Sequence, residues 1–191
     1  MSFISYQLSG KYIHLMMMYN LILALVPYVL QKIKVKSKII YGLIRVVWLL
    51  FLPNTFYMLT DLIHIGLFEF KVYDDVYSQV YVQNIVPWIE LTSYILIILV
   101  GVWIGVKTIY NELHEYDYRL RKPLTLIIGV LCSVGVYIGR YLRLNSWDVL
   151  NPVGILNLFF ESFNLFSIEF IALFSIIIIV LILAYDTYCE K

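Results

Sequence analysis

The chain has 191 residues, of which 62% are hydrophobic and only 14% charged, and its formal net charge is +1. Soluble domains carry roughly 25% charged residues, and even a domain of about 150 residues leaves roughly 30% of its unfolded surface exposed. This composition therefore excludes an ordinary soluble domain and indicates a protein whose solvent is largely lipid.

Apolar stretches recur along the whole chain at lengths close to the roughly 20 residues that a bilayer requires. They cover residues 13–31, 39–58, 88–110, 124–142 and 165–185. Pro53 lies inside the second stretch, where a proline kinks a helix or restarts it. We therefore expect an all-α bundle of five transmembrane helices that forms a single integral membrane domain over residues 1–191.

The orientation of these helices is predicted by the distribution of positive charge. Basic residues gather after the first and third stretches: Lys32, Lys34, Lys36, Lys38, Arg119, Arg121 and Lys122. Because cytoplasmic loops are enriched in Lys and Arg, we expect the N-terminus outside and the C-terminus in the cytoplasm of a multi-pass cell-membrane protein. Topology and anionic lipid account for these charges, so membrane lipid is an expected partner and nucleic acid is not.

The third and fourth stretches contain the similar segments GVWIG and GVYIG. Gly101 and Gly105, like Gly135 and Gly139, are four residues apart, the spacing that lets membrane helices approach closely. In the expected topology the two pairs lie at opposite depths, so each should pack against a different neighbour. They are also candidate surfaces for self-association or for contact with other membrane proteins.

A first polar group of residues lies in FLPNTFYMLTDLIHI. If this segment is helical, Asn54, Tyr57, Asp61 and His64 lie on one face of it. Polar side chains among lipid are costly and therefore need partners. Asn20, inside the first stretch, is for the same reason expected to make an interhelical hydrogen bond.

A second polar group lies in GRYLRLNSWDVL. The segment NSWD is typical of a helix start, with Asn145 or Ser146 as the N-cap and Asp148 in the first turn. Trp147 suits the membrane–water interface. Capping does not explain the arginines at positions 140 and 143, which are one helical turn apart.

Both polar groups lie on the extracytoplasmic side of the expected topology, which leaves three interpretations. Arg140 or Arg143 could pair with Asp61 and lock two helices together. The arginines could instead bind an anionic group such as a lipid headgroup. Alternatively, Asp61 and His64 could act as acid and base on a lipid-linked or cell-envelope substrate. Neither a His-Glu-x-x-His pattern nor a cysteine pair is present, so no metal is expected, and no cofactor is indicated.

The two polar segments closely resemble the signature stretches of the domain-of-unknown-function 1361 family, multi-pass membrane proteins of bacteria and archaea. YNLILALVPYVL and VPWIELTSY resemble weaker landmarks of that family, so the resemblance covers about Tyr19 to Asn151. Glu90 stands where the family pattern has an aspartate. The resemblance implies no substrate, but it places characteristic positions at Pro53, Asn54, Tyr57, Thr60, Asp61, His64, Gly139, Arg140, Arg143, Asn145, Trp147 and Asp148.

We therefore expect a non-catalytic binding or partner module whose polar cluster holds an anionic headgroup or locks the bundle through Asp61, His64, Arg140, Arg143 and Asp148. A membrane-embedded enzyme is the alternative, and a transporter subunit is third. The enzyme predicts an open cavity around Asp61 and His64. The lock predicts direct contact between Asp61 and an arginine, with no room beside them.

Overall fold

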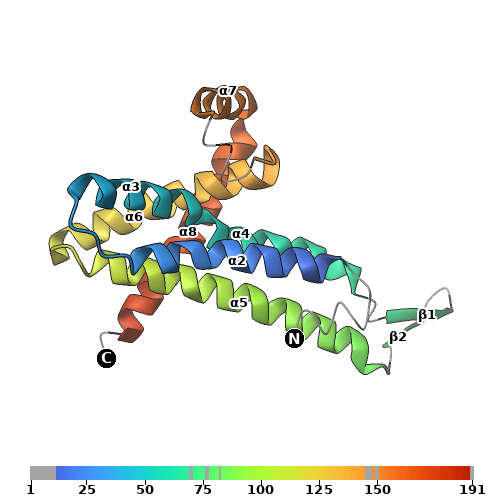
Figure 1. Cartoon of the computed structure of the whole chain (residues 1–191). Helices are drawn as coiled ribbons and strands as arrows, with labels where there is room; N and C mark the ends of the chain where they lie inside the picture. Colours follow the sequence, from blue (N-terminus) through green and yellow to red (C-terminus); the bar gives the residue numbers. More distant parts are fainter. Residues whose placement is uncertain are drawn as a thin grey trace.

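The structure, a computed structural model, describes residues 12–68, 71–75, 78–81, 83–144, 148 and 151–189. This part of the chain is a helical bundle with five helices long and apolar enough to cross a membrane (Figure 1). The prediction of an all-α bundle with five candidate spans is thereby confirmed, apart from one short β-hairpin.

The first span is helix α2 (Ile13–Gln31), and the second runs through three consecutive helical segments. These segments are α3 (Lys38–Phe51), α4 (Pro53–Thr60) and the 3-10 helix η1 (Asp61–Leu67). The predicted kink or restart at Pro53 is confirmed, because the proline ends one helix and occupies the first turn of the next. The second span therefore extends past the predicted residue 58.

A β-hairpin follows the second span. Strands β1 (Lys71–Asp75) and β2 (Ser78–Tyr81) pair antiparallel, with Lys71 opposite Tyr81. No strand is predicted in the expected all-α chain, and the recurring Val-Tyr pairs of this segment, both residue types that favour strands, are the signal that was available. The hairpin projects away from the helices at one end of the bundle (Figure 1).

The third and fourth spans are α5 (Ile85–Leu113) and α6 (Tyr118–Tyr141). Both start before the predicted positions, because side chains just upstream cap them. Asn84 accepts a hydrogen bond from the backbone N–H of Val86 at 3.0 Å, and Asp117 accepts one from that of Arg119 at 2.9 Å. The basic residues that follow the third span consequently lie in the first turns of α6 and not in a loop.

The chain ends in α7 (Pro152–Ser162) and the fifth span, α8 (Leu165–Cys189). The helix start predicted at NSWD lies a few residues ahead of α7, which lies apart from the bundle at the start of α8 (Figure 1). Asn151 caps α7 by accepting the N–H of Gly154 at 3.1 Å. The predicted caps Asn145 and Ser146 fall outside the described residues, as does Trp147.

Two names are used below for the ends of the bundle. The end with the connections 32–37 and 114–117 is the basic end, and the end with β1 and β2 is the hairpin end. Successive spans run in alternating directions between these ends, with the hairpin between the second span and α5, and α7 between α6 and α8.

Helix α4 lies in the middle of the bundle, in contact with α2, α5 and α6. A Cβ atom on Gly105 would overlap Thr55, and one on Gly101 would overlap Met58, so α5 approaches one side of α4 through its glycines. Helix α6 approaches the opposite side in the same way, and there a Cβ atom would meet Pro53 from Gly135 and the ring of Tyr57 from Gly139. The prediction that the two glycine pairs have different neighbours is therefore wrong. They lie against the two sides of one short helix, because Thr55 and Met58 point away from Pro53 and Tyr57 on the helical wheel.

Candidate functional site

The centre of the candidate site is Asp61, at the junction of α4 and η1, whose side chain has no exposed surface. Arg140 of α6 places its Nη2 atom 2.5 Å from Oδ1 of Asp61. Asn20 of α2 donates a hydrogen bond from Nδ2 to the other carboxylate oxygen, Oδ2, at 3.0 Å. Residues far apart in the chain thus meet on both oxygens of one buried carboxylate. The hydrogen bond expected from Asn20 is confirmed.

Arg140 is held mainly by side chains of α4. Its Nε and Nη2 atoms donate to the hydroxyl oxygen of Thr60 at 2.8 and 2.5 Å, and that hydroxyl donates in turn to the backbone oxygen of Tyr57 at 2.6 Å. The guanidinium carbon lies 4.5 Å from the centre of the Tyr57 ring, in a cation–π arrangement. These contacts fix both the position and the plane of the guanidinium group.

Helix α5 contributes Tyr94, which is fully buried and donates its hydroxyl proton to the backbone oxygen of Asp61. A partner for this carbonyl is needed where the regular α-helical bonding pattern of α4 gives way to the 3-10 helix. The Tyr94 ring packs edge-on against Phe68 at 5.4 Å, and Phe68 lies 6.0 Å from the ring of buried His14. We call Asn20, Tyr57, Thr60, Asp61, Tyr94 and Arg140 the Asp61 cluster.

The Asp61 cluster contains one acidic and one basic side chain, Asp61 and Arg140, whose opposite charges are in direct contact. An unpaired carboxylate in an apolar, membrane-embedded setting is strongly unfavourable, and an arginine in direct contact offsets that penalty. The Asp61 side chain is 0% exposed and that of Arg140 is 17% exposed, so the pair is accessible only from the arginine side. Within the described part of the chain, Arg140 makes these hydrogen bonds through Nε and Nη2, and its Nη1 atom donates none of them.

Some residues predicted for the site lie outside this cluster. His64 is half-buried one 3-10 turn beyond Asp61, and within the described part of the chain its side chain makes no hydrogen bond or ion pair with the cluster. Asn54 donates to the backbone oxygen of Phe51 at 2.9 Å, next to the break at Pro53. No three His, Cys, Asp or Glu side chains of the described ranges are grouped as they would be around a metal ion.

Arg143 does not share the role of Arg140, although the two are one helical turn apart in the sequence. Helix α6 ends at Tyr141, and Arg143 has a backbone φ of 54°, so its exposed side chain does not continue the face that carries Arg140. Asp148 accepts the backbone N–H of Asn151 at 2.8 Å through its own backbone oxygen, just ahead of α7. The predicted site residues Asn145 and Trp147 lie outside the described residues.

A second polar cluster, which sequence analysis does not identify, lies at the basic end. Arg45 of α3 places Nη1 2.5 Å from the carboxylate of Glu112 and Nη2 3.3 Å from that of Glu115, both near the end of α5. Gln31 of α2 donates to the backbone oxygen of Thr108 at 2.7 Å. Arg45 and Glu112 are far apart in the sequence, so their contact could not be predicted from it. The only local signal was the single charged residue, Arg45, within a mainly apolar span.

Three members of the Asp61 cluster were not assigned to the site from the sequence. For Asn20 the sequence predicts an interhelical hydrogen bond but not its partner. Thr60 falls on a characteristic family position, but a threonine bonded to its own helix gives no sequence signal of a partner. Tyr94 is one of 17 tyrosines, and only the structure distinguishes it from those at the membrane surface.

The comparisons with known proteins assign no activity. A family model described as "Protein of unknown function (DUF1361)" matches residues 19–181, which include every described member of the Asp61 cluster. No curated protein and no solved structure matches the chain. The function therefore has to be argued from the geometry of the site.

Proposed function

We propose that this chain, which belongs to the DUF1361 family of proteins of unknown function, is a non-catalytic binding or partner protein of the membrane. In this proposal the Asp61 cluster fastens the helices and does no chemistry. The observation that carries it is the state of the Asp61 carboxylate, which has no exposed surface and has Arg140 on one oxygen and Asn20 on the other.

The same observation disfavours the enzymatic alternative. A general base must come within hydrogen-bond reach of a proton on its substrate, which requires room beside the carboxylate. Arg140 occupies that position at Oδ1, and buried Asp61 offers a substrate no other approach. In this proposal His64, whose side chain makes no hydrogen bond to the cluster among the described residues, does not act as an acid–base partner of Asp61.

The binding role in this proposal belongs to the arginines at the hairpin end. A guanidinium group has five N–H donors, and Nε and Nη2 of Arg140 point to Thr60 and Asp61, which leaves Nη1 for a ligand. Asp61 neutralises the charge of Arg140, so the exposed Arg143 supplies the net positive charge. Guanidinium groups match the geometry of phosphate, which favours an anionic headgroup as the ligand.

The proposal includes an orientation. The hairpin end faces the extracytoplasmic side of the cell membrane, with the N-terminus outside and the C-terminus inside. Support comes from the lysines of residues 32–38 and the basic first turns of α6, which all lie at the other end of the bundle.

Native mass spectrometry of the protein, extracted gently from its own membranes, tests the binding role. We expect the wild type to carry a phosphate-containing lipid, and Arg143→Gln to lower its occupancy about fivefold, the effect of one basic residue at a membrane surface. Arg119→Gln, an exposed arginine at the other end of α6, is the matched control and should retain the lipid. A wild type without lipid, or equal losses in both variants, would contradict binding at the hairpin end.

A further inference from the structure

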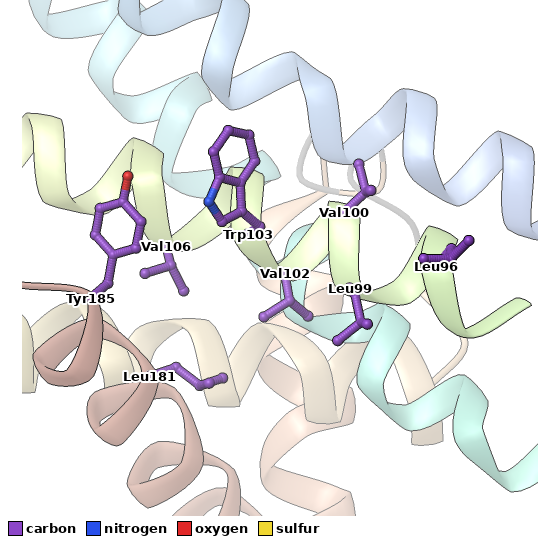
Figure 2. Close-up of a pocket in the computed structure, with 8 residues that line it drawn as sticks. All are labelled: Leu96, Leu99, Val100, Val102, Trp103, Val106, Leu181 and Tyr185. Atoms are coloured by element: carbon purple, nitrogen blue, oxygen red, sulfur yellow. The ribbon is translucent and has the colours of Figure 1, made fainter. Parts of the chain in front are cut away.

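A groove with a volume of about 530 Å³ lies between α5 and α8, away from the Asp61 cluster (Figure 2). Its lining consists of α5 side chains from Leu96 to Val106, together with Leu181 and Tyr185 of α8. The α5 residues lie in a row along the helix, and the two α8 residues lie beside the Val106 end of that row (Figure 2).

The groove is concave because small buried residues form its floor and larger exposed ones its sides. Val102 and Val106 are 7% and 4% exposed, whereas Leu99 and Trp103 are 57% and 51% exposed. From Leu96 to Val106 the helix rises roughly 15 Å. The groove is therefore long, narrow and apolar, a shape that suits an extended hydrocarbon chain.

Positive charge lies at the basic end of this groove. The Nζ atom of Lys107 is 4.7 Å from the centre of the Trp103 ring, so the ammonium group adjoins the groove wall. Lys32, at the end of the neighbouring helix α2, lies 4.1 Å above the Tyr28 ring. The apolar groove thus leads to the ammonium group of Lys107, the order in which a phospholipid presents its acyl chain and its phosphate.

We propose that this groove binds one anionic phospholipid from the leaflet at the basic end, with an acyl chain along α5 and the phosphate at Lys107. Charge complementarity favours a lipid over a second copy of the chain. Two copies in one membrane share the same orientation, and symmetric pairing through this face would bring Lys107 and Lys32 of one copy toward those of the other. The lining of the groove does not include Arg143, and the site does not depend on the proposed function.

The test uses purified full-length protein that has been stripped of lipid and mixed with phosphatidylglycerol or phosphatidylcholine carrying identical acyl chains. Native mass spectrometry measures the bound fraction of each lipid. In an Arg143→Gln background, which weakens the hairpin-end site, we expect one tightly held phosphatidylglycerol per chain, and Lys107→Gln to lower the preference for it about fivefold. Lys36→Gln, which changes an exposed lysine in the connection after α2, should leave the preference unchanged.

A second variant tests the apolar part of the site. Val102→Phe places a ring on the groove floor, and both lipids should then be lost, while circular dichroism and gel filtration show a folded monomer. If that variant does not fold, Leu99→Ala removes an exposed side chain from the groove wall instead and should weaken the binding of both lipids equally. An unchanged lipid preference in Lys107→Gln would overturn the proposal. So would unchanged binding in the groove variants, or a lipid-free dimer as the main wild-type species.

Discussion

At the scale of single residues, Asp61 draws side chains from three other helices. Arg140 and Asn20 bind its carboxylate, and Tyr94 binds its backbone oxygen. Hydrogen bonds to a charged group in a buried site are stronger than those between neutral groups, and an unfilled position there leaves the full desolvation penalty. Each partner of Asp61 is therefore expected to contribute to stability beyond an average contact.

Asn20→Ala tests this expectation with a small change. It leaves Oδ2 of Asp61 without its donor, and we expect the free energy of unfolding in detergent micelles to fall by about 1.5–3 kcal/mol. Asn111→Ala, which removes an exposed 3.4 Å hydrogen bond to Gln31, is the control and should change stability by less than about 0.5 kcal/mol. Equal effects of the two substitutions would show that Asn20 does not stabilise the carboxylate.

Two substitutions of Arg143 are expected to affect stability differently while both weaken binding. Its φ of 54° lies in the left-handed region, which costs a side chain roughly 1–2 kcal/mol and glycine almost nothing. We expect Arg143→Gly to raise the free energy of unfolding by about 1 kcal/mol while it weakens binding of the anionic headgroup. Arg143→Ala keeps the Cβ atom, so it should weaken binding without the gain in stability. A gain with alanine equal to that with glycine would contradict the backbone explanation.

The sequence shows which residues of this site are polar within apolar stretches, but it tells less about how these residues pair. Asp61 and Arg140 are identifiable because a charge near a span end needs a partner. The choice of Arg140 over Arg143 depends on the last turn of α6, and the choice of Asn20 as the second partner depends on the packing of α2 against α4. Neither of these leaves a pattern in the local sequence.

At the scale of helices, α4 owes its central place to glycines on both neighbours. The glycine spacing was recognised from the sequence, but the common partner was not, because the depth of each span was inferred from apolar lengths alone. Caps outside those lengths extend α5 and α6, which changes the depths at which their glycines lie. For α7 the sequence predicts a start at NSWD, ahead of the observed cap at Asn151, but no extent, because 11 residues are too few for a span.

Substitution of the glycines tests the packing around α4. Gly135→Ala would place a methyl group against the rigid ring of Pro53, and we expect a loss of about 1–3 kcal/mol in the free energy of unfolding. Gly42→Ala in α3 is the matched control, since a Cβ atom there meets nothing within 4 Å and should add up to about 1 kcal/mol through helix propensity. An unchanged free energy of unfolding for Gly135→Ala would show that α6 can move away from α4 to make room for the methyl group.

At the scale of the whole molecule, two ion-pair clusters stand at opposite ends of an apolar interior. Arg140 and Asp61 join α6 to the second span at the hairpin end, and Arg45 and Glu112 join α3 to α5 at the basic end. Between them the helices are held by close packing of glycines and apolar side chains. The arrangement suits a protein crossing a bilayer, where charge is tolerated near the surfaces and costly in the middle.

The proposed orientation can be checked with cysteines already in the chain. Cys132 is buried and Cys189 is exposed. We expect a membrane-impermeant maleimide to label Cys189 only after the cells are permeabilised. A Gln83→Cys variant in a Cys189→Ser background, with its thiol beside the hairpin, should react in intact cells. The reverse labelling pattern would invert the topology and with it the side assigned to the arginines.

The central claim is that Asp61 and Arg140 form a structural lock, and a double-mutant cycle tests it most directly. The measurement is the free energy of unfolding of Asp61→Ala, Arg140→Ala and the double variant in the same micelles. Each single variant should lose about 3 kcal/mol or more, because it leaves a buried charge without its partner, and the double variant should lose clearly less than the sum. Additive losses, or single losses below about 0.5 kcal/mol, would contradict the lock.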